Sequence, residues 1–510
     1  MRLLFCCEFY FPSVGGVQEV MRQIAERLVR RGHDVTVATT RLSNRNFFAH
    51  NGVKIVEFGV SGNLVRGIDG EIERYREFVR SFDCDAIMIK AAQQWTFDAI
   101  WPDLDNISAR KVLIPCGFSG LFEPHYASYF QELPAILRKF DHLIFYAQHY
   151  RDVNFARDHK LGPLSVLANG ACEIEFGVEK DRHFRRTHGI PEDSVVLLTV
   201  GSLTGVKGHK ELLEAFVRLK NSCRHVTLIL NGNSPPKPQV VVGRPSPVAP
   251  VQRVAPNETV PAPHLGQRMS RVYKLEGMAG LFDRVRHHRQ RLRRELVDVL
   301  SKWVGVPVKI HRVLREEGLQ GIRLRAMHRL VPRLGRSKLL RYMPASIRAL
   351  SDPMAFWIEE AKRNPAEKLL ILSDYPREEL VQAYMAADLF VFASNIEYSP
   401  LVLFESVAAA TPFLSVPVGN AEEIAKWTGG GIICPANKDE RGYTRADPKV
   451  LAAEIAKAIE DPAALAALGQ SGHLAWKNSY TWDAIATKYE AILRTNPVNK
   501  SRDAQVCEPV

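Results

Sequence analysis

The sequence lacks the features that mark secreted, zinc-binding and membrane-spanning proteins. Its eight cysteines are scattered over 510 residues, with no Cys-x-x-Cys pair and no metal-ligand spacing. No apolar run approaches the roughly 18 residues that a membrane-spanning helix needs. The first residues, MRLLFCCEFYFPSVGG, contain no small-residue cleavage site of a secretory signal. We therefore expect a cytoplasmic protein with reduced cysteines.

Two common glycine-rich nucleotide motifs are also absent. No G-x-G-x-x-G segment occurs, so nothing in the sequence supports a nicotinamide or flavin dinucleotide cofactor. Residues 201–210 are rich in glycine, but they do not match the Walker motif G-x-x-x-x-G-K-[ST]. We expect no cofactor of either kind.

Positive charge is concentrated in one segment of the chain. The overall composition, 46% hydrophobic and 24% charged, is that of a folded globular protein with a net charge of +12. Residues 235–348 hold 24 Lys and Arg against 7 Asp and Glu, which leaves 44 against 49 in the remainder. A slightly acidic body therefore carries a strongly basic insertion, and any argument from charge concerns that insertion.

Two stretches of the chain alternate strand and helix patterns. Residues 2–7 form an apolar run, a turn follows at 12–16, and a helical stripe at 17–29 leads into a second apolar run at 34–39. A second start of the same kind lies at 194–200, followed by a glycine-rich turn and a helical stripe at 212–219. The patterns predict an α/β protein with two doubly wound parallel sheets, which bind ligands at the carboxyl ends of their strands.

The same patterns predict the domain boundaries. We expect a first domain at 1–188 and a second at 189–234 and 351–480, interrupted by the basic insertion at 235–350. The insertion begins with a linker rich in proline and valine and continues from about residue 268 as amphipathic cationic helices. We expect a C-terminal helix at 481–496 that crosses back to the first domain, and a polar tail at 497–510.

The densest group of candidate site residues lies between Ser394 and Glu405. It falls between a buried strand at 389–393 and an expected helix at 401–410, whose first N–H groups would form an anion site. The backbone of that site would be Ser399, Pro400, Leu401 and Val402. Glu397 in the loop and Glu405 in the helix would flank the anion and suit sugar hydroxyls. By themselves, these residues equally fit a helix cap with a surface glutamate.

The spacing Glu397-x7-Glu405, with the sequences around it, resembles the signature of retaining nucleotide-sugar glycosyltransferases of family 4. Those enzymes have the GT-B architecture, in which two Rossmann-like domains face each other across a cleft. The similarity extends to Gly15-Gly16, to 169–170, to 200–208 and to the closing Tyr-Thr-Trp-Asp at 480–483. It covers about three quarters of the chain, and the basic insertion lies outside it.

The resemblance implies a role for each matching residue. Glu405 corresponds to the glutamate that grips the nucleotide ribose, and Glu397 to the one that contacts the donor sugar. Ser399 to Val402 would receive the diphosphate on backbone amides. Lys207 corresponds to the diphosphate-binding lysine, which neutralises the leaving group as the glycosidic bond breaks. A solvated lysine at a turn is the alternative for Lys207.

Other matching positions line the site or depart from the family pattern. Gly15 and Gly16 would let the first loop pass close to a ligand, although a tight turn without a ligand also explains them. Ser202 stands where the family often has an arginine, and Cys116 where many relatives have a histidine. We expect Cys116 to shape the substrate site rather than act as a nucleophile. A remaining aromatic candidate, Trp95, fits the acceptor side and the core equally well.

The resemblance implies the transfer of a hexose from a nucleotide diphosphate-sugar to a hydroxyl of a glycan or lipid-linked acceptor, with retention of anomeric configuration, in cell-surface polysaccharide or glycolipid synthesis. The leaving phosphate would help to deprotonate the acceptor. We expect no metal, because Lys207 and the helix terminus can supply the positive field. A sugar-nucleotide epimerase on the same scaffold is the alternative enzyme.

The basic insertion supports a second set of hypotheses. Its amphipathic stretches place Trp303 on the apolar face and arginines on the polar face, which suits peripheral docking of residues 267–348 on an anionic membrane. A solvated subdomain or an oligomer contact is an equally open interpretation. A non-enzymatic nucleic-acid-binding role is disfavoured, because the insertion has few aromatic residues for base stacking.

Overall fold

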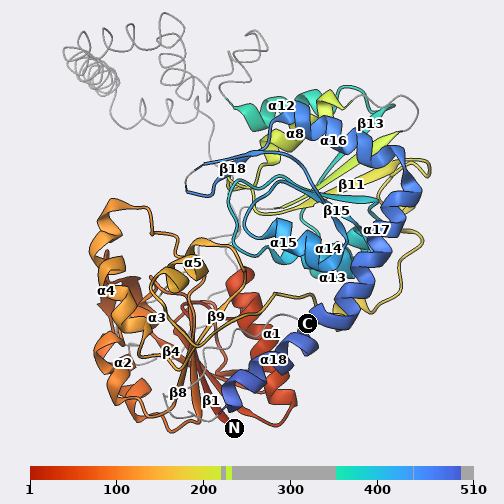
Figure 1. Ribbon diagram of the computed structural model, residues 1–510. Helices are drawn as coiled ribbons and strands as arrows, with labels where there is room; N and C mark the ends of the chain where they lie inside the picture. The colour runs from red at the N-terminus through yellow and green to blue at the C-terminus, as the bar shows by residue number, and fades with distance from the viewer. Residues whose placement is uncertain (220–224, 233–239, 241–351, 440, 496–510) are drawn as a thin grey trace, which may run out of the picture. The chain divides into compact units, whose positions relative to one another are not determined.

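The computed structural model describes residues 1–219, 225–232, 240, 352–439 and 441–495. Two α/β sheets lie within one compact unit, residues 1–244 with 357–510 (Figure 1). A second unit, residues 245–356, lies almost wholly outside the described residues. The predicted linker and cationic helices of the insertion, and the tail at 497–510, fall outside them as well. The predicted α/β architecture with two Rossmann-like halves is confirmed.

The first sheet has eight strands in the order β10-β9-β8-β7-β1-β2-β4-β3. All neighbours are parallel except β3, which pairs antiparallel with β4. The strands are β1 (Arg2–Cys6), β2 (Asp34–Thr40), β3 (Ala49–His50), β4 (Val53–Phe58), β7 (Ala86–Lys90), β8 (Arg110–Ile114), β9 (His142–Phe145) and β10 (Leu164–Val166), with a separate hairpin of β5 (Val60–Asn63) and β6 (Gly67–Gly70). The central strands are buried on both faces, as a parallel sheet covered by helices requires.

The second sheet has six parallel strands in the order β13-β12-β11-β14-β15-β16. In chain order this is 3-2-1-4-5-6, the Rossmann arrangement, with its topological switch point between β11 and β14. The strands are β11 (Val195–Val200), β12 (Val226–Asn231), β13 (Lys368–Ser373), β14 (Leu389–Phe392), β15 (Phe413–Ser415) and β16 (Gly431–Ile433), with a separate hairpin of β17 (Asn437–Lys438) and β18 (Thr444–Arg445).

Helices cover both sheets. Those of the first half are α1 (Gly16–Arg30), α2 (Ile72–Ser81), α3 (Trp95–Asp98), α4 (Ala127–Leu137) and α5 (Arg151–Asp158), and the segment between the sheets contains α6 (Glu173–Phe176) and α7 (Phe184–Thr187). Those of the second half are α8 (His209–Arg218), α12 (Pro353–Ala361), α13 (Arg377–Ala386), α14 (Leu401–Ala408), α15 (Ala421–Thr428), α16 (Pro448–Glu460) and α17 (Pro462–Ala475), after which the chain continues into α18 (Trp482–Arg494). Helices α2, α3 and α4 cover one face of the first sheet, while α1 and α18 cover the other.

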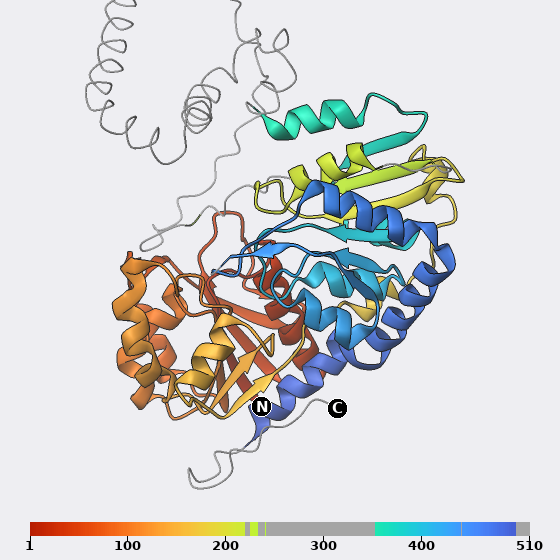
Figure 2. The ribbon, with the colours of Figure 1, turned by 45° about the horizontal axis from the view of Figure 1, so that its top comes forward.

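The last helix, α18, packs against the first half of the chain. Figures 1 and 2 show it running beside α1, and its apolar residues join the same buried cluster as β1. The Glu490 carboxylate accepts hydrogen bonds from Arg31 and His33, each at 2.9 Å. Arg110 donates to the carbonyl of Ile492 at 2.8 Å. These contacts tie the end of the described chain to the first sheet.

Candidate functional site

Two loops meet at the switch point of the second sheet. One follows β11 and contains Lys207, and the other follows β14 and contains Glu397. The amide of Asn395 donates to the carbonyl of Val206 at 2.9 Å, which joins the loops directly. Gly208 lies at a φ of 69°, and a Cβ there would stand 1.7 Å from the carbonyl oxygen of Ala393. Only glycine permits this approach of the two backbones.

The structure brings Lys207 and Glu397 into direct contact. The Lys207 ammonium lies 2.5 Å from Oε1 of Glu397, and the Ser394 hydroxyl donates to the same oxygen at 2.9 Å. Both side chains are partly exposed, so a ligand can reach them. Lys207 is therefore the partner of an ion pair, and its side chain stays partly exposed. A charged pair at the carboxyl edge of a Rossmann sheet can bind an anion through the lysine and a hydroxyl through the carboxylate.

The amino end of α14 opens at the same edge of the sheet. The helix begins at Leu401, and within the described residues the amides of Leu401 and Val402 donate no hydrogen bond. Pro400 stands at the N-cap and carries no amide hydrogen, so it cannot bind an anion as the sequence analysis supposed. The available donors are the amides of Ser399, Leu401 and Val402. The hydroxyl oxygen of Ser399 is buried and has no partner among the described residues.

Glu405 is held by two side chains that the sequence analysis did not identify. Its Oε1 lies 2.7 Å from Nη2 of Arg377, and its Oε2 accepts from the Tyr384 hydroxyl at 3.1 Å. Arg377 begins α13, directly beyond the carboxyl end of β13. Nothing in the local sequence pattern points to Arg377, because its partner is 28 positions away. The carboxylate is mostly buried, with 12% of its side chain exposed.

The first sheet contributes the loop that contains Gly15 and Gly16. A Cβ built on Gly16 would meet only Leu401, the first residue of α14, at 4.0 Å. The side chain of Leu401, at the start of α14, therefore lies beside Gly16 at the start of α1. At Gly15 the atoms nearest to an added Cβ would be those of the flexible Gln18 side chain, the first at 2.6 Å. The open space beside Gly16 is compatible with the close passage of a ligand.

Tyr398 fastens the Glu397 loop to the first half of the chain. Its hydroxyl accepts from the amide of Tyr146 at 3.0 Å and lies close enough to the Asp152 carboxylate to lower the pKa of that group. Its ring lies 4.6 Å from that of Tyr150, whose hydroxyl donates to the carbonyl of Glu397 at 2.8 Å. Tyr398 was not among the residues predicted for the site. Its contact residues lie about 250 positions away, so no local pattern could have identified it.

Three further candidates from the sequence are Trp95, Cys116 and Ser202. Trp95 is fully buried and donates to the Thr40 hydroxyl at 2.9 Å, so it belongs to the core of the first half and does not line an acceptor surface. Cys116 follows β8 with a φ of 65°. Burial raises the pKa of its thiol, and nearby Lys90 opposes this only in part. A largely protonated thiol is a poor nucleophile, in keeping with a shaping role. The side chain of Ser202 makes no hydrogen bond within the described residues.

The chain contains two Asp-x-Asp sequences, and both lie away from this site. Asp83 pairs with Arg2, and Asp103 pairs with Arg76 at 2.6 Å. Asp105 pairs with Lys139. Among the described residues, no three His, Cys, Asp or Glu side chains come together as a metal-binding group.

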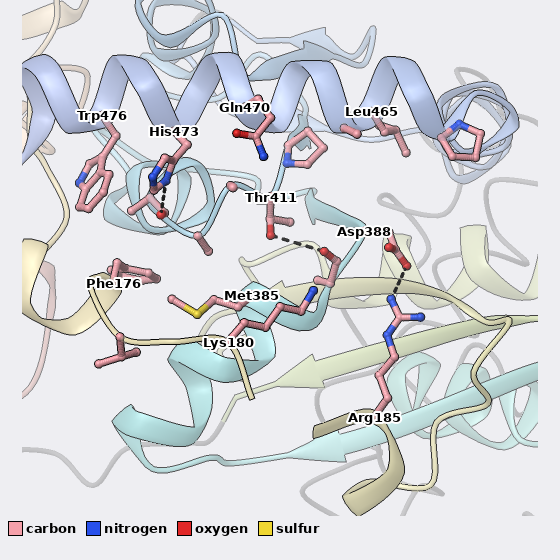
Figure 3. A pocket seen from close by; sticks show the side chains of 18 of the residues that line it. Phe176, Lys180, Arg185, Met385, Asp388, Thr411, Leu465, Gln470, His473 and Trp476 are labelled. Atoms are coloured by element: carbon pink, nitrogen blue, oxygen red, sulfur yellow. Dashed lines mark hydrogen bonds and ion pairs between the residues drawn. The ribbon is translucent and has the colours of Figure 1, made fainter. Parts of the chain in front are cut away.

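A pocket of about 940 Å³ opens at the opposite edge of the second sheet (Figure 3). Its lining includes Arg185 and Asp388, which form an ion pair at 2.9 Å, and His473, which contacts the carbonyl of Ala408 at 2.8 Å. The pocket surrounds the amino ends of β11, β14 and β15, and none of the predicted site residues lines it. The predicted site and this pocket are therefore separate.

Two protein-family models match segments that contain part of this site, while Lys207 lies outside both. The model "Glycosyl transferases group 1" matches residues 358–474, and "Glycosyl transferase 4-like domain" matches residues 15–101. The first segment includes the Glu397 loop and α14, and the second begins at Gly15. Sucrose-phosphate synthase from Thermosynechococcus elongatus superposes with a TM-score of 0.58 at 15% identity, covering 97% of this chain and 98% of that one. The chain has the GT-B fold of glycosyltransferases.

A second solved structure matches nearly the whole chain, whereas a relative matches about a quarter of it. Anabaena HepE in complex with UDP-glucose matches the GT-B chain with a TM-score of 0.53 at 13% identity, covering 97% and 99% of the two chains. D-inositol 3-phosphate glycosyltransferase from Thermobispora bispora is 31% identical over 131 residues, 24% of the GT-B chain. The matched segment spans 28% of the length of that relative. Within the described part of the GT-B chain, no helix combines the length and apolar character needed to cross a membrane.

Proposed function

We propose that the chain transfers a sugar from a nucleotide diphosphate-sugar to a hydroxyl acceptor. The observation that carries the proposal is the contact between Lys207 and Glu397 at the switch point between β11 and β14. The free amides at the start of α14 open at the same edge, and Glu405 lies one turn further on. This arrangement provides a cation and amide donors for a diphosphate, and two carboxylates for hydroxyl groups.

In the proposed reaction, each group has a distinct task. The diphosphate draws Lys207 away from Glu397, and the lysine then stabilises the charge that develops on the leaving phosphate. Glu397, released from the lysine, accepts hydrogen bonds from the donor sugar. Glu405 accepts hydrogen bonds from the ribose. We infer that the leaving phosphate itself accepts the acceptor proton, so the product keeps the anomeric configuration and no metal is required.

The proposed acceptor rests on similar proteins and on the loops of the first half of the chain. One relative acts on D-inositol 3-phosphate, and a solved neighbour binds UDP-glucose. A polyol or glycolipid hydroxyl, presented by the loops after β1, β7 and β8, fits that comparison. We propose a hexose as the transferred sugar and cell-surface glycolipid or polysaccharide synthesis as the setting. Cytoplasmic location and membrane docking through residues 267–348 remain predictions.

The decisive experiment is a transfer assay on the full chain. A thermal-shift panel of UDP, GDP, ADP and their sugars identifies the donor, and mass spectrometry with candidate polyols and glycolipids detects the product. The K207A variant should lower transfer about 100-fold or more, because it removes a charge that faces the leaving group. The matched control is K210A, three residues further on in α8, where the partly exposed lysine pairs with the buried carboxylate of Glu211.

Several results would contradict the proposal. Full activity of K207A or E405A would remove the assigned site. Turnover of the nucleotide-sugar at an equal rate without any acceptor would indicate an epimerase instead. Inversion at the anomeric carbon, read from the product by NMR, would overturn the retaining route. Loss of activity in EDTA, restored by a divalent cation, would overturn the metal-free route.

A further inference from the structure

Arg377 lies between two carboxylates from different parts of the chain. Its Nη2 is 2.7 Å from Oε1 of Glu405 and 2.6 Å from Oε2 of Glu175, and its Nε donates to the same Glu175 oxygen at 3.1 Å. Burial works against the charged guanidinium, but the two carboxylates more than offset it and raise the pKa of Arg377. The arginine therefore stays charged and bonded to both partners.

These contacts fix the orientation of the Glu405 carboxylate. Arg377 contacts one oxygen, and the hydroxyl of the fully buried Tyr384 donates to the other. A carboxylate has about four acceptor positions, so two donors leave room for two further hydrogen bonds. A vicinal pair of hydroxyls is a ligand of that kind. The glutamate is thus held with its free acceptor positions in one defined direction.

Glu175 connects this arrangement to the segment between the two sheets. It lies in α6, nine positions beyond the end of β10, the last strand of the first sheet. The guanidinium also lies 5.7 Å from the ring of Phe176. Because Arg377 keeps 39% of its side chain exposed, the pair with Glu175 is partly screened by water, and its main effect is geometric. Glu175 holds the arginine in place, and the arginine holds Glu405.

We propose that Arg377 is a positioning residue, supported by Glu175, that sets Glu405 to recognise the intact ribose diol of a nucleoside diphosphate. The inference rests on the proposed function, since it assigns a nucleotide to this site. It adds that discrimination between ribose and 2′-deoxyribose depends on a side chain that does not itself touch the sugar. A neutral residue at 377 would leave Glu405 held by Tyr384 alone and would reduce that discrimination.

The test compares the binding of ribonucleotides with that of their 2′-deoxy forms. Isothermal titration calorimetry on the full chain, with UDP and GDP against 2′-deoxy-UDP and 2′-deoxy-GDP, gives the ratio of dissociation constants. We expect the wild type to prefer the ribonucleotide about tenfold or more, the size of a hydrogen bond to a charged group. R377Q should bring the ratio to about twofold by weakening the ribonucleotide and leaving the deoxy form nearly unchanged.

Matched variants distinguish a loss of Glu405 positioning from a loss of folding as the cause of a changed ratio. R377K keeps the charge without the two-sided guanidinium and should retain an intermediate ratio. E175Q should lower the ratio less than R377Q does, because the contact with Glu405 remains. The control R218Q removes an arginine paired with Glu214 on α8 and should behave as wild type. Circular dichroism and melting of each variant check that it is folded.

Each outcome decides the matter. An R377Q variant that weakens both nucleotides equally, or keeps the wild-type ratio, overturns the positioning role. A wild type that binds nucleotides without distinguishing the 2′-deoxy form overturns it too, while the transferase proposal stands on its transfer assay. A wild type that binds none of the nucleotides removes the proposed function together with this inference.

Discussion

The ammonium of Lys207 and the carboxylate of Glu397 are each other's counter-ions, 2.5 Å apart. The two groups come from loops 190 positions apart that meet at one sheet edge. A diphosphate must therefore compete with Glu397 for the lysine. Loss of the Glu397 charge should then strengthen nucleotide binding and weaken sugar transfer.

The first prediction concerns E397Q. Removing the carboxylate charge frees Lys207, so a nucleoside diphosphate should bind about three- to tenfold more tightly, as expected for the loss of a partly exposed competing pair. Sugar transfer should fall, because the donor sugar loses a charged acceptor. Calorimetry and the transfer assay measure the two effects. Weaker nucleotide binding by this variant would contradict the competition.

The second prediction compares two glycines in one loop. G208A places a Cβ 1.7 Å from the Ala393 carbonyl oxygen at a φ of 69°, so the two loops must separate. We expect at least about 3 kcal/mol of destabilisation and the loss of nucleotide binding. Gly205 has a φ of 80° with nothing within 4 Å of an added Cβ, so G205A should cost only about 1 kcal/mol of backbone strain. Equal melting temperatures of the two variants would refute the distinction.

The third prediction concerns the hydroxyl of Tyr398. Y398F leaves the Tyr146 amide without this partner, which should cost about 1–3 kcal/mol. Burial raises the pKa of Asp152 to about 6, and the nearby Tyr398 hydroxyl opposes that rise, so the pKa should rise further in the variant. Melting curves and NMR titration of the carboxyl group test both effects. An unchanged Asp152 pKa would show that the Tyr398 hydroxyl does not act on this carboxylate.

The fourth prediction is a pH dependence at α18. Hydrogen bonding to His33, with further contacts from Arg494 and Arg31, lowers the pKa of Glu490 to about 2 from its usual 4.5. The ionised form is favoured in the folded state, so its stabilisation is complete above pH 4.5 and is lost as the pH falls towards 2. E490Q should lower the melting temperature at pH 7, and the difference from wild type should shrink steadily below pH 4.5. E460Q, on the exposed surface of α16, is the control and should show no such trend.

Local patterns predicted the secondary structure around the site to within about two residues. The strand expected at 389–393 is β14, Leu389–Phe392, and the helix expected at 401–410 is α14, Leu401–Ala408. The helix ends earlier because Ala410 adopts a φ of 57°. The mistaken role for Pro400 needed no structure to correct, since the missing N–H follows from its covalent formula. The side of the sheet on which Trp95 lies could not be read from the sequence.

The sequence by itself determined the two parallel sheets and the edge at which a ligand would bind, because hydrophobic periodicity and turn residues act over a few neighbouring positions. It also placed Lys207, Glu397 and Glu405 in loops and helix starts at that edge. Only the tertiary structure decided which of these charges pair, and it added Arg377, Glu175 and Tyr398, whose partners lie 28 to about 250 positions away. Such pairings depend on how whole elements pack, which no local pattern encodes.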